Sequence, residues 1–202
     1  MEDKQLSSRE SLQIIQQMID AAKQEQKDDG LGWIVWGWLL FLTSILTWIN
    51  LYTGWFSTFI FWTAAGIVTL LARLFEMARK QFFPKKEIVR TYTRDLFEKL
   101  NTGFFIMLLL IIVAMNMNVD PKKGFALLIG IYGFWMLIYG SVFTFRPSVI
   151  GAFVTWAFGL SALFVRSFEW TMILHAAAVL CGYIIPGYIA RKEFKKLSLV
   201  KS

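Results

Sequence analysis

Six long apolar stretches, separated by short polar segments, make up most of the chain. They cover residues 31–50, 55–74, 102–119, 124–144, 148–165 and 170–190. An α-helix needs roughly 20 residues to cross about 30 Å of hydrocarbon, and each stretch is close to that length. The pattern predicts an all-α fold, a polytopic membrane bundle of six transmembrane helices that contacts the lipid bilayer.

The lysines and arginines fall mainly on one side of this predicted bundle. The predicted parts are an N-terminal segment 1–29, a six-span domain 30–190 with a basic connection 75–100, and a basic tail 191–202. The side opposite the termini receives only Lys122, Lys123 and Arg166. Because positive residues favour the cytoplasmic side of membrane proteins, both termini are expected in the cytoplasm.

Composition agrees with a membrane domain and narrows its partners. Hydrophobic residues make up 56% of the chain, the mean hydropathy is +0.53 and the formal net charge is +7. Membrane insertion and anionic lipid already account for cations in cytoplasmic connections, so no nucleic-acid partner is expected. The lone Cys181 cannot form a disulfide within one chain.

The segment 1–29 has the pattern of an amphipathic helix. Leu12, Ile15 and Ile19 recur on one face, after a capping-box spacing of Ser and Glu. Acidic residues outnumber basic ones in this segment, whereas a helix that lies on an anionic leaflet would be basic. We therefore expect its apolar face to contact a protein surface.

The basic connection between the second and third spans predicts a second amphipathic helix. Beyond Pro84, residues Ile88, Tyr92, Leu96 and Leu100 keep helical spacing and run into the third span. One hypothesis is that this helix and the oppositely charged N-terminal helix dock as a cytoplasmic cap. The alternative is that both lie in solvent or against lipid.

Small residues form stripes at helical spacing in the last three spans. They are Ala126, Gly130, Gly133 and Gly140, then Ser148, Ala152, Thr155, Gly159 and Ala162, then Thr171, His175, Ala178 and Gly182. Helices in lipid associate through close backbone approach, so these spans are expected to form the tight core. The stripes could instead join two copies in a homo-oligomer. The third span has no small residue between Met107 and Val113 and should be the most exposed to lipid, and Pro186 should kink the last span.

Deep tryptophans offer two interpretations. Trp36, Trp62, Trp135 and Trp156 lie away from the ends of the spans. They could line a ligand pocket, but large aromatic side chains at this depth more often pack the bundle or face lipid. No site is predicted from them.

The only histidine, His175, is the sharpest chemical candidate. Its place on the stripe of the last span points it into the bundle, where an imidazole needs a partner. Asn50, Asn116, Arg166 and Glu169 fall at a similar level near the outer ends of the spans. Together these five residues predict either an outward-facing polar vestibule or a wet rim without function.

Motifs for catalysis and cofactors are missing from the sequence. It has no His-Glu-x-x-His, no phosphate-binding glycine-rich loop and no cysteine or histidine cluster, so no cofactor, metal or catalytic residue is expected. Two functions stay open. The first is a non-enzymatic interaction or regulatory protein whose cytoplasmic face binds a protein partner. The alternative is a small transporter or channel that uses the vestibule around His175.

Short motifs spread over nearly the whole chain support a family resemblance. They are Ser8-Arg9-Glu10-Ser11-Leu12, Met18-Ile19, Trp36-Gly37-Trp38, Phe145-Arg146-Pro147, Ile150-Gly151 and Ile185-Pro186-Gly187-Tyr188-Ile189. With these motifs the chain resembles a family of uncharacterised small six-span bacterial integral membrane proteins. The resemblance implies a bacterial cytoplasmic-membrane protein with a short cytoplasmic N-terminal helix, and it supplies no catalytic residues.

Overall fold

The computed structural model describes residues 29–82, 92–117 and 119–199, and these form helices without any strand. The elements are α2 (Leu31–Thr53), α3 (Ile60–Phe82), α4 (Tyr92–Met117), α5 (Pro121–Val142), α6 (Arg146–Phe164), α7 (Phe168–Val179), the π-helix η1 (Leu180–Ile184) and α8 (Ile185–Leu199). Five helical segments are long and apolar enough to cross a membrane, and the apolar part of α3, Ile60–Ala72, is shorter. The all-helical fold is therefore confirmed, with five to six apolar helices that could span a membrane.

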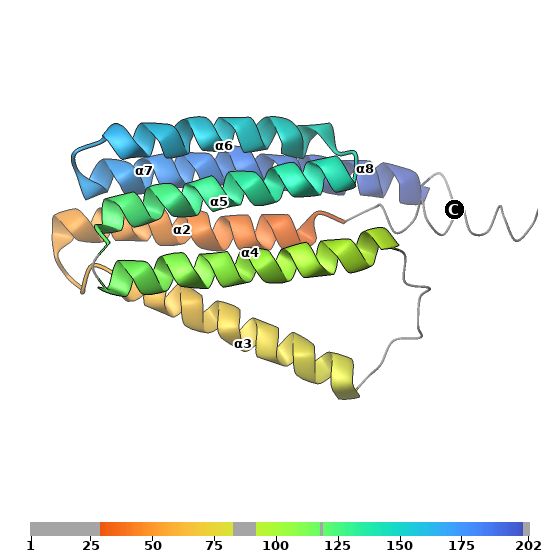
Figure 1. Ribbon diagram of the computed structural model, residues 1–202, viewed down its shortest axis with the longest axis horizontal. Helices are drawn as coiled ribbons and strands as arrows, with labels where there is room; N and C mark the ends of the chain where they lie inside the picture. The colour runs from red at the N-terminus through yellow and green to blue at the C-terminus, as the bar shows by residue number, and fades with distance from the viewer. Residues whose placement is uncertain (1–28, 83–91, 118, 200–202) are drawn as a thin grey trace, which may run out of the picture.

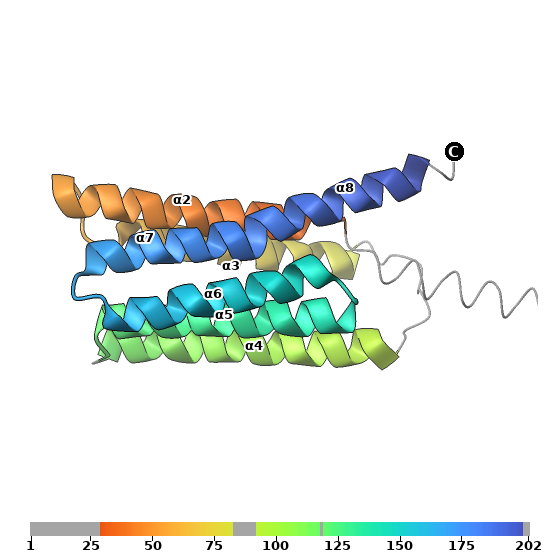
Figure 2. The same ribbon diagram turned by 90° about the horizontal axis from the view of Figure 1, so that it is seen from above.

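The helices run side by side as an elongated bundle, with α3 set apart (Figures 1 and 2). Helix α2 packs against α7, α7 against α6, α6 against α5, and α5 against α4. Helix α3 approaches only α2 closely with its backbone and diverges from the bundle toward its C-terminal end (Figure 1). We call the end of the bundle where α2 ends the Asn50 end, and the opposite one the Trp33 end.

The connection from α2 to α3 does not coincide with the polar segment between the predicted stretches 31–50 and 55–74. Helix α2 ends at Thr53, Gly54 adopts φ 65°, and α3 begins only at Ile60. The side chain of Asn50 holds this loop in place. Its Nδ2 donates to the carbonyl of Phe56 and its Oδ1 accepts from the Phe56 amide, both at 2.9 Å, so the loop folds back over the end of α2.

The small-residue stripes of the last three spans are buried, as predicted, except at Gly130, which is half-buried. Every member of the α6 stripe is buried, and so are Thr171, His175, Ala178 and Gly182 in the last span. A Cβ atom added at Gly133 would lie 2.6 Å from the indole of Trp156, so only glycine lets that ring in. The same indole donates from Nε1 to the carbonyl of Gly130 at 2.9 Å and fastens α6 to α5.

The core also includes α2, which the sequence interpretation left out. Its buried face consists of Gly37, Leu40, Thr43, Ser44, Thr47 and Asn50, and it packs mainly against α7 and η1. These residues recur every three or four positions, which is the same small and hydroxyl-bearing stripe seen in the last spans. The prediction of a core made by the last three spans alone was therefore too narrow.

The last span is interrupted before its proline. Five residues, Leu180–Ile184, form the π-helix η1, and the amide of Ile185 donates to the carbonyl of Leu180. Pro186 has no N–H to give to the preceding turn, and a π-bulge is one way for a helix to absorb that loss. Beyond it, α8 continues to Leu199, so most of the predicted tail 191–202 extends the helix.

Helices α3 and α4 contribute little to the core. Among their described side chains the buried hydrophobic ones are Ala65 in α3 and Phe104 in α4. The expectation that the third span, α4, is highly exposed agrees with this, but α3 is exposed to a similar degree. The helix predicted to run through Tyr92 into the third span is present as α4, whereas residues 1–28 and 83–91 lie outside the described chain.

Candidate ligand pocket and buried histidine

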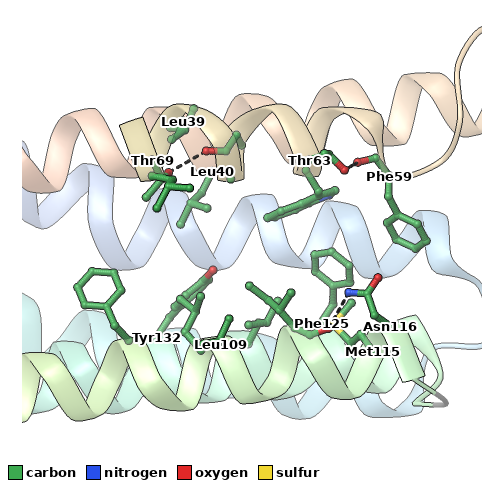
Figure 3. A pocket seen from close by; sticks show the side chains of 18 of the residues that line it. Leu39, Leu40, Phe59, Thr63, Thr69, Leu109, Met115, Asn116, Phe125 and Tyr132 are labelled. Carbon is green, nitrogen blue, oxygen red and sulfur yellow. Dashed lines mark hydrogen bonds between the residues drawn. The ribbon is translucent and has the colours of Figure 1, made fainter. Parts of the chain in front are cut away.

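A pocket of about 550 Å³ lies where α3 diverges from α4. Its walls come from α2, α3, α4 and α5, and its ends are marked by Phe59 and Asn116 on one side and by Thr69 and Tyr132 on the other (Figure 3). The volume falls within the roughly 300–1,000 Å³ that is usual for small-molecule sites. It therefore has room for a ligand rather than for a few waters.

The lining of the pocket is almost wholly apolar. It includes Leu39, Leu40, Leu70, Leu108, Leu109, Ile112, Met115 and Leu128, together with the aromatic side chains of Trp36, Phe59, Trp62, Phe105 and Phe125. Two of the four deep tryptophans thus line a pocket, whereas Trp156 packs on Gly133 and Trp135 stacks on Phe104 at 5.1 Å. Half of the set therefore borders a cavity and the other half packs the bundle, and ligand binding by the first half stays a prediction.

Most polar side chains that line the pocket donate hydrogen bonds to carbonyls four residues earlier in the chain. Thr63 and Thr69 donate to carbonyls one turn earlier in α3, at 3.1 and 2.8 Å. Asn116, which is exposed, donates to the carbonyl of Ile112 at 2.8 Å and turns its amide toward the pocket (Figure 3). The hydroxyl of Tyr132 points toward the space between α3 and α4 (Figure 3). Such a surface suits a long apolar chain with few polar atoms.

His175 is fully buried and points into the bundle, as its stripe position predicted. Its Nδ1 lies 2.8 Å from the hydroxyl oxygen of Ser44 in α2. The rings of Trp62, Phe125 and Tyr132 surround it edge-to-face, with centroids 5.2, 5.7 and 5.7 Å away. All three of these rings also line the pocket, so the imidazole sits directly behind the pocket wall.

The hydrogen bonds of Ser44 assign a tautomer to this histidine. Its hydroxyl is assigned as the donor to the carbonyl of Leu40 at 2.7 Å, because a carbonyl can only accept. With its one proton directed to that carbonyl, the hydroxyl oxygen accepts from Nδ1–H of His175. The other ring nitrogen, Nε2, then carries a lone pair, and it has no hydrogen-bond partner among the described residues.

The five residues predicted as a vestibule are not drawn together around His175. Asn50 is buried and closes the loop after α2, and Asn116 lies on the pocket between α3 and α4. Arg166 is exposed and offers its carbonyl to Lys122, while Glu169 lies half-buried in the first turn of α7. Only Asn116 and the rings in front of His175 border the same cavity. The vestibule itself stays a prediction.

The predicted cytoplasmic docking face lies almost wholly beyond the part of the chain that the structure describes. Leu12, Ile15, Ile19 and Ile88 fall outside it, and Tyr92 is placed only as the first residue of α4. Docking of the two amphipathic segments therefore stays a prediction as well.

No protein-family model, curated protein or solved structure matches the chain. The resemblance to small six-span bacterial membrane proteins thus remains an expectation from the sequence motifs. In residues 29–82, 92–117 and 119–199 no three His, Cys, Asp or Glu side chains gather in a way that could hold a metal ion.

Two parts of the site escaped the sequence interpretation. Ser44 was missed as the partner of His175, although the stripe that runs through Gly37, Ser44 and Thr47 was visible in the first span. The pocket was missed because it depends on the angle of α3, which no local pattern encodes. The deep Trp36 and Trp62 were the available signal.

Proposed function

We propose that the protein is a non-enzymatic, multi-pass membrane protein that binds a bilayer molecule with a long apolar chain between α3 and α4. The observation that carries this proposal is the pocket of about 550 Å³ with its nearly continuous apolar lining. A site of this size and character is the usual form of a small-molecule site. Because the outer faces of α3 and α4 are exposed, a molecule already in the bilayer can enter from the side.

The distribution of polar groups supports binding rather than chemistry. The hydroxyls of Thr63 and Thr69 are directed to carbonyls of their own helix. His175, the candidate acid or base, lies behind the rings of Trp62 and Tyr132. Among the described residues that line the pocket there is no His, Cys, Asp, Glu or Lys to serve as acid, base or nucleophile, and this lining favours a role in holding a ligand.

We further propose that α3 is the sixth span, that both termini are cytoplasmic and that the membrane is the bacterial inner membrane. The support is the positive-inside distribution of lysine and arginine together with the family resemblance. Under this topology the Trp33 end faces the cytoplasm, and α3 opens away from α4 in that direction (Figure 1).

The binding of a protein partner, which the sequence predicts for the cytoplasmic face, is compatible with this pocket. Helices α3 and α4 border the pocket, and the chain between them, residues 83–91, belongs to the basic cytoplasmic connection. A molecule bound between the two helices would favour one separation of their ends. We propose that a protein partner, or a second copy of the chain, responds to that separation at the cytoplasmic face.

Photo-crosslinking tests the pocket. The full-length protein in lipid nanodiscs would be loaded with a phospholipid that carries a diazirine on its acyl chain, and the labelled residues would be mapped by mass spectrometry. Label is expected to concentrate on pocket residues such as Leu109 and Ile112 over Phe153, which faces outward on α6. Gly66→Leu fills the pocket, because Gly66 lines it and a Cβ there meets no atom within 4 Å.

The matched control is Gly103→Leu. Gly103 lies on α4, is equally free of neighbours within 4 Å and does not line the pocket. Loss of label at Leu109 in Gly66→Leu, with label kept in Gly103→Leu and at Phe153 in both variants, supports the proposal. Even labelling of all exposed helix faces, unchanged in Gly66→Leu, would show that the pocket holds only bulk lipid.

A further inference from the structure

Three buried polar atoms cluster behind the pocket without a hydrogen-bond partner among the described residues. They are Nε1 of Trp62, Nε2 of His175 and the hydroxyl of Tyr183. Buried polar groups are nearly always paired, because leaving one unpaired in an apolar environment costs free energy. Three in one region therefore mark a place where a polar partner is bound.

Ring contacts connect these groups to each other and to the pocket. The Trp62 and His175 rings are 5.2 Å apart and nearly perpendicular, at 86°. Tyr132 contacts His175 at 5.7 Å and Tyr183 at 5.8 Å. Trp62 and Tyr132 belong to the pocket wall, so Nε1 of Trp62 and Nε2 of His175 are the two unpaired atoms nearest to a ligand.

These two atoms have opposite requirements. An indole Nε1–H can only donate. The Ser44 hydroxyl holds the proton of His175 on Nδ1, so Nε2 can only accept. A single group that accepts from Trp62 and donates to His175 would satisfy both, and a hydroxyl has this combination.

We propose that the molecule bound between α3 and α4 is an alcohol, a long apolar chain bearing a hydroxyl that accepts from Trp62 and donates to His175. This inference rests on the proposed binding function and names its ligand class. The half-buried Trp62 ring belongs to the pocket wall in front of His175, so this ring must rotate for the hydroxyl to reach Nε2.

Other polar groups fit the pair less well. A carboxylate or an ether oxygen accepts from Trp62 but has no proton for Nε2 of His175. An ammonium group donates to His175 but cannot accept from the indole. The apolar lining of Leu39, Leu109 and Phe105 offers no counter-charge to either ion, so a neutral group that both accepts and donates is required, and a hydroxyl is the smallest such group on an apolar chain.

Three probes that share a hexadecyl chain test the two hydrogen bonds separately. Hexadecane has no polar atom, hexadecyl methyl ether can only accept, and hexadecanol can both accept and donate. Saturable binding of each to the full-length protein in nanodiscs would be measured, with the pocket-filled Gly66→Leu variant as the baseline for partition into lipid. Binding is expected to rise from alkane to ether to alcohol, with about tenfold between the ends of the series. In Trp62→Phe the ether should fall to the level of the alkane, while the alcohol keeps an advantage through His175.

Trp156→Phe is the matched control, because it removes an indole that is bonded to Gly130 in α5 and does not line the pocket. It should leave the order of the three probes unchanged. Equal binding of alcohol and alkane by the wild-type chain would overturn the inference and leave the apolar site intact, with water as the partner of the two atoms. An order that survives in Trp62→Phe would also overturn it. Absence of saturable binding for all three probes would overturn the proposed function itself.

Discussion

Two pairs of neighbouring helices in this protein are packed very differently. Helices α5 and α6 press together through glycine and alanine, and Gly140 comes so near Val149 that a Cβ atom there would lie 2.8 Å from its backbone nitrogen. Helices α3 and α4 approach no closer than their side chains and leave a pocket between them. Yet α4 is more apolar than α5 or α6.

The comparison shows what holds helices together in lipid. A leucine gains little by leaving hydrocarbon for the face of another helix, so apolarity alone does not pair helices. Small residues allow close backbone approach, and hydrogen bonds such as Trp156 to Gly130 add to it. On the open pair, the face of α4 carries bulky side chains such as Leu109, whereas the face of α3 includes Gly66 and Thr69, and the separated backbones leave room for a ligand.

The largest expected effect comes from Gly140→Leu, which places a bulky side chain between the closely packed helices α5 and α6. Its Cβ would meet Val149 at 2.7 Å on the side chain and 2.8 Å on the backbone, and backbone cannot move aside cheaply. We expect a loss of about 3 kcal/mol in the free energy of unfolding, at the upper end for overpacking. Steric trapping or SDS titration in mixed micelles would measure it.

Gly103→Leu is the counterpart in the open pair and should cause no loss, with a gain of roughly 0.5 kcal/mol because leucine favours the helix over glycine. A Cβ at Gly103 meets nothing within 4 Å. Similar losses in both variants would mean that α4 is packed as tightly as α5 and α6, against the difference drawn between the two pairs.

A smaller effect is expected from Asn50→Leu, which tests how α3 is attached. The leucine has a similar size, but the N–H and C=O of Phe56 lose the bonds that the Asn50 amide makes at 2.9 Å. We expect a loss of about 2 kcal/mol and faster hydrogen exchange at the Phe56 amide. Thr53→Val, which removes an exposed bond to Ile49 in the same helix, should leave both unchanged. If exchange at Phe56 stayed slow in Asn50→Leu, the loop would be held by other contacts.

The sequence predicts the close packing of α5 and α6 much better than the open arrangement of α3 and α4. The stripes of the last spans are local patterns, and the packing they favour depends on side-chain size at fixed helical spacing. They correctly placed Gly159, Ala162, Thr171 and His175 in the core. Burial of His175 followed from the same pattern.

The open arrangement of α3 and α4 depends on contacts between segments that are distant in the sequence. The tilt of α3 is set by the Asn50 loop and by Trp62 resting on Phe125 at 4.7 Å, and neither contact has a local signature. For the same reason the sequence indicated that His175 needs a partner but not that Ser44, 131 residues away, supplies it. The deep tryptophans were compatible with both packing and a pocket, and only the arrangement of helices separates the two uses.

The smallest expected effect is a gain, from Gly103→Ala in α4. Glycine within a helix costs roughly 0.5–1 kcal/mol relative to alanine through backbone entropy, and the open surroundings of Gly103 impose no penalty in return. Gly159→Ala in α6 should forgo that gain, because the new methyl would lie 3.1 Å from the Ile129 side chain. Unfolding free energies of the two variants would be compared under one condition. A gain at Gly103 and a loss at Gly159 would show that glycine serves close approach in the tight pair and is dispensable in the open one. A loss at Gly103 would instead mean that α4 meets another surface there, such as a second copy of the chain.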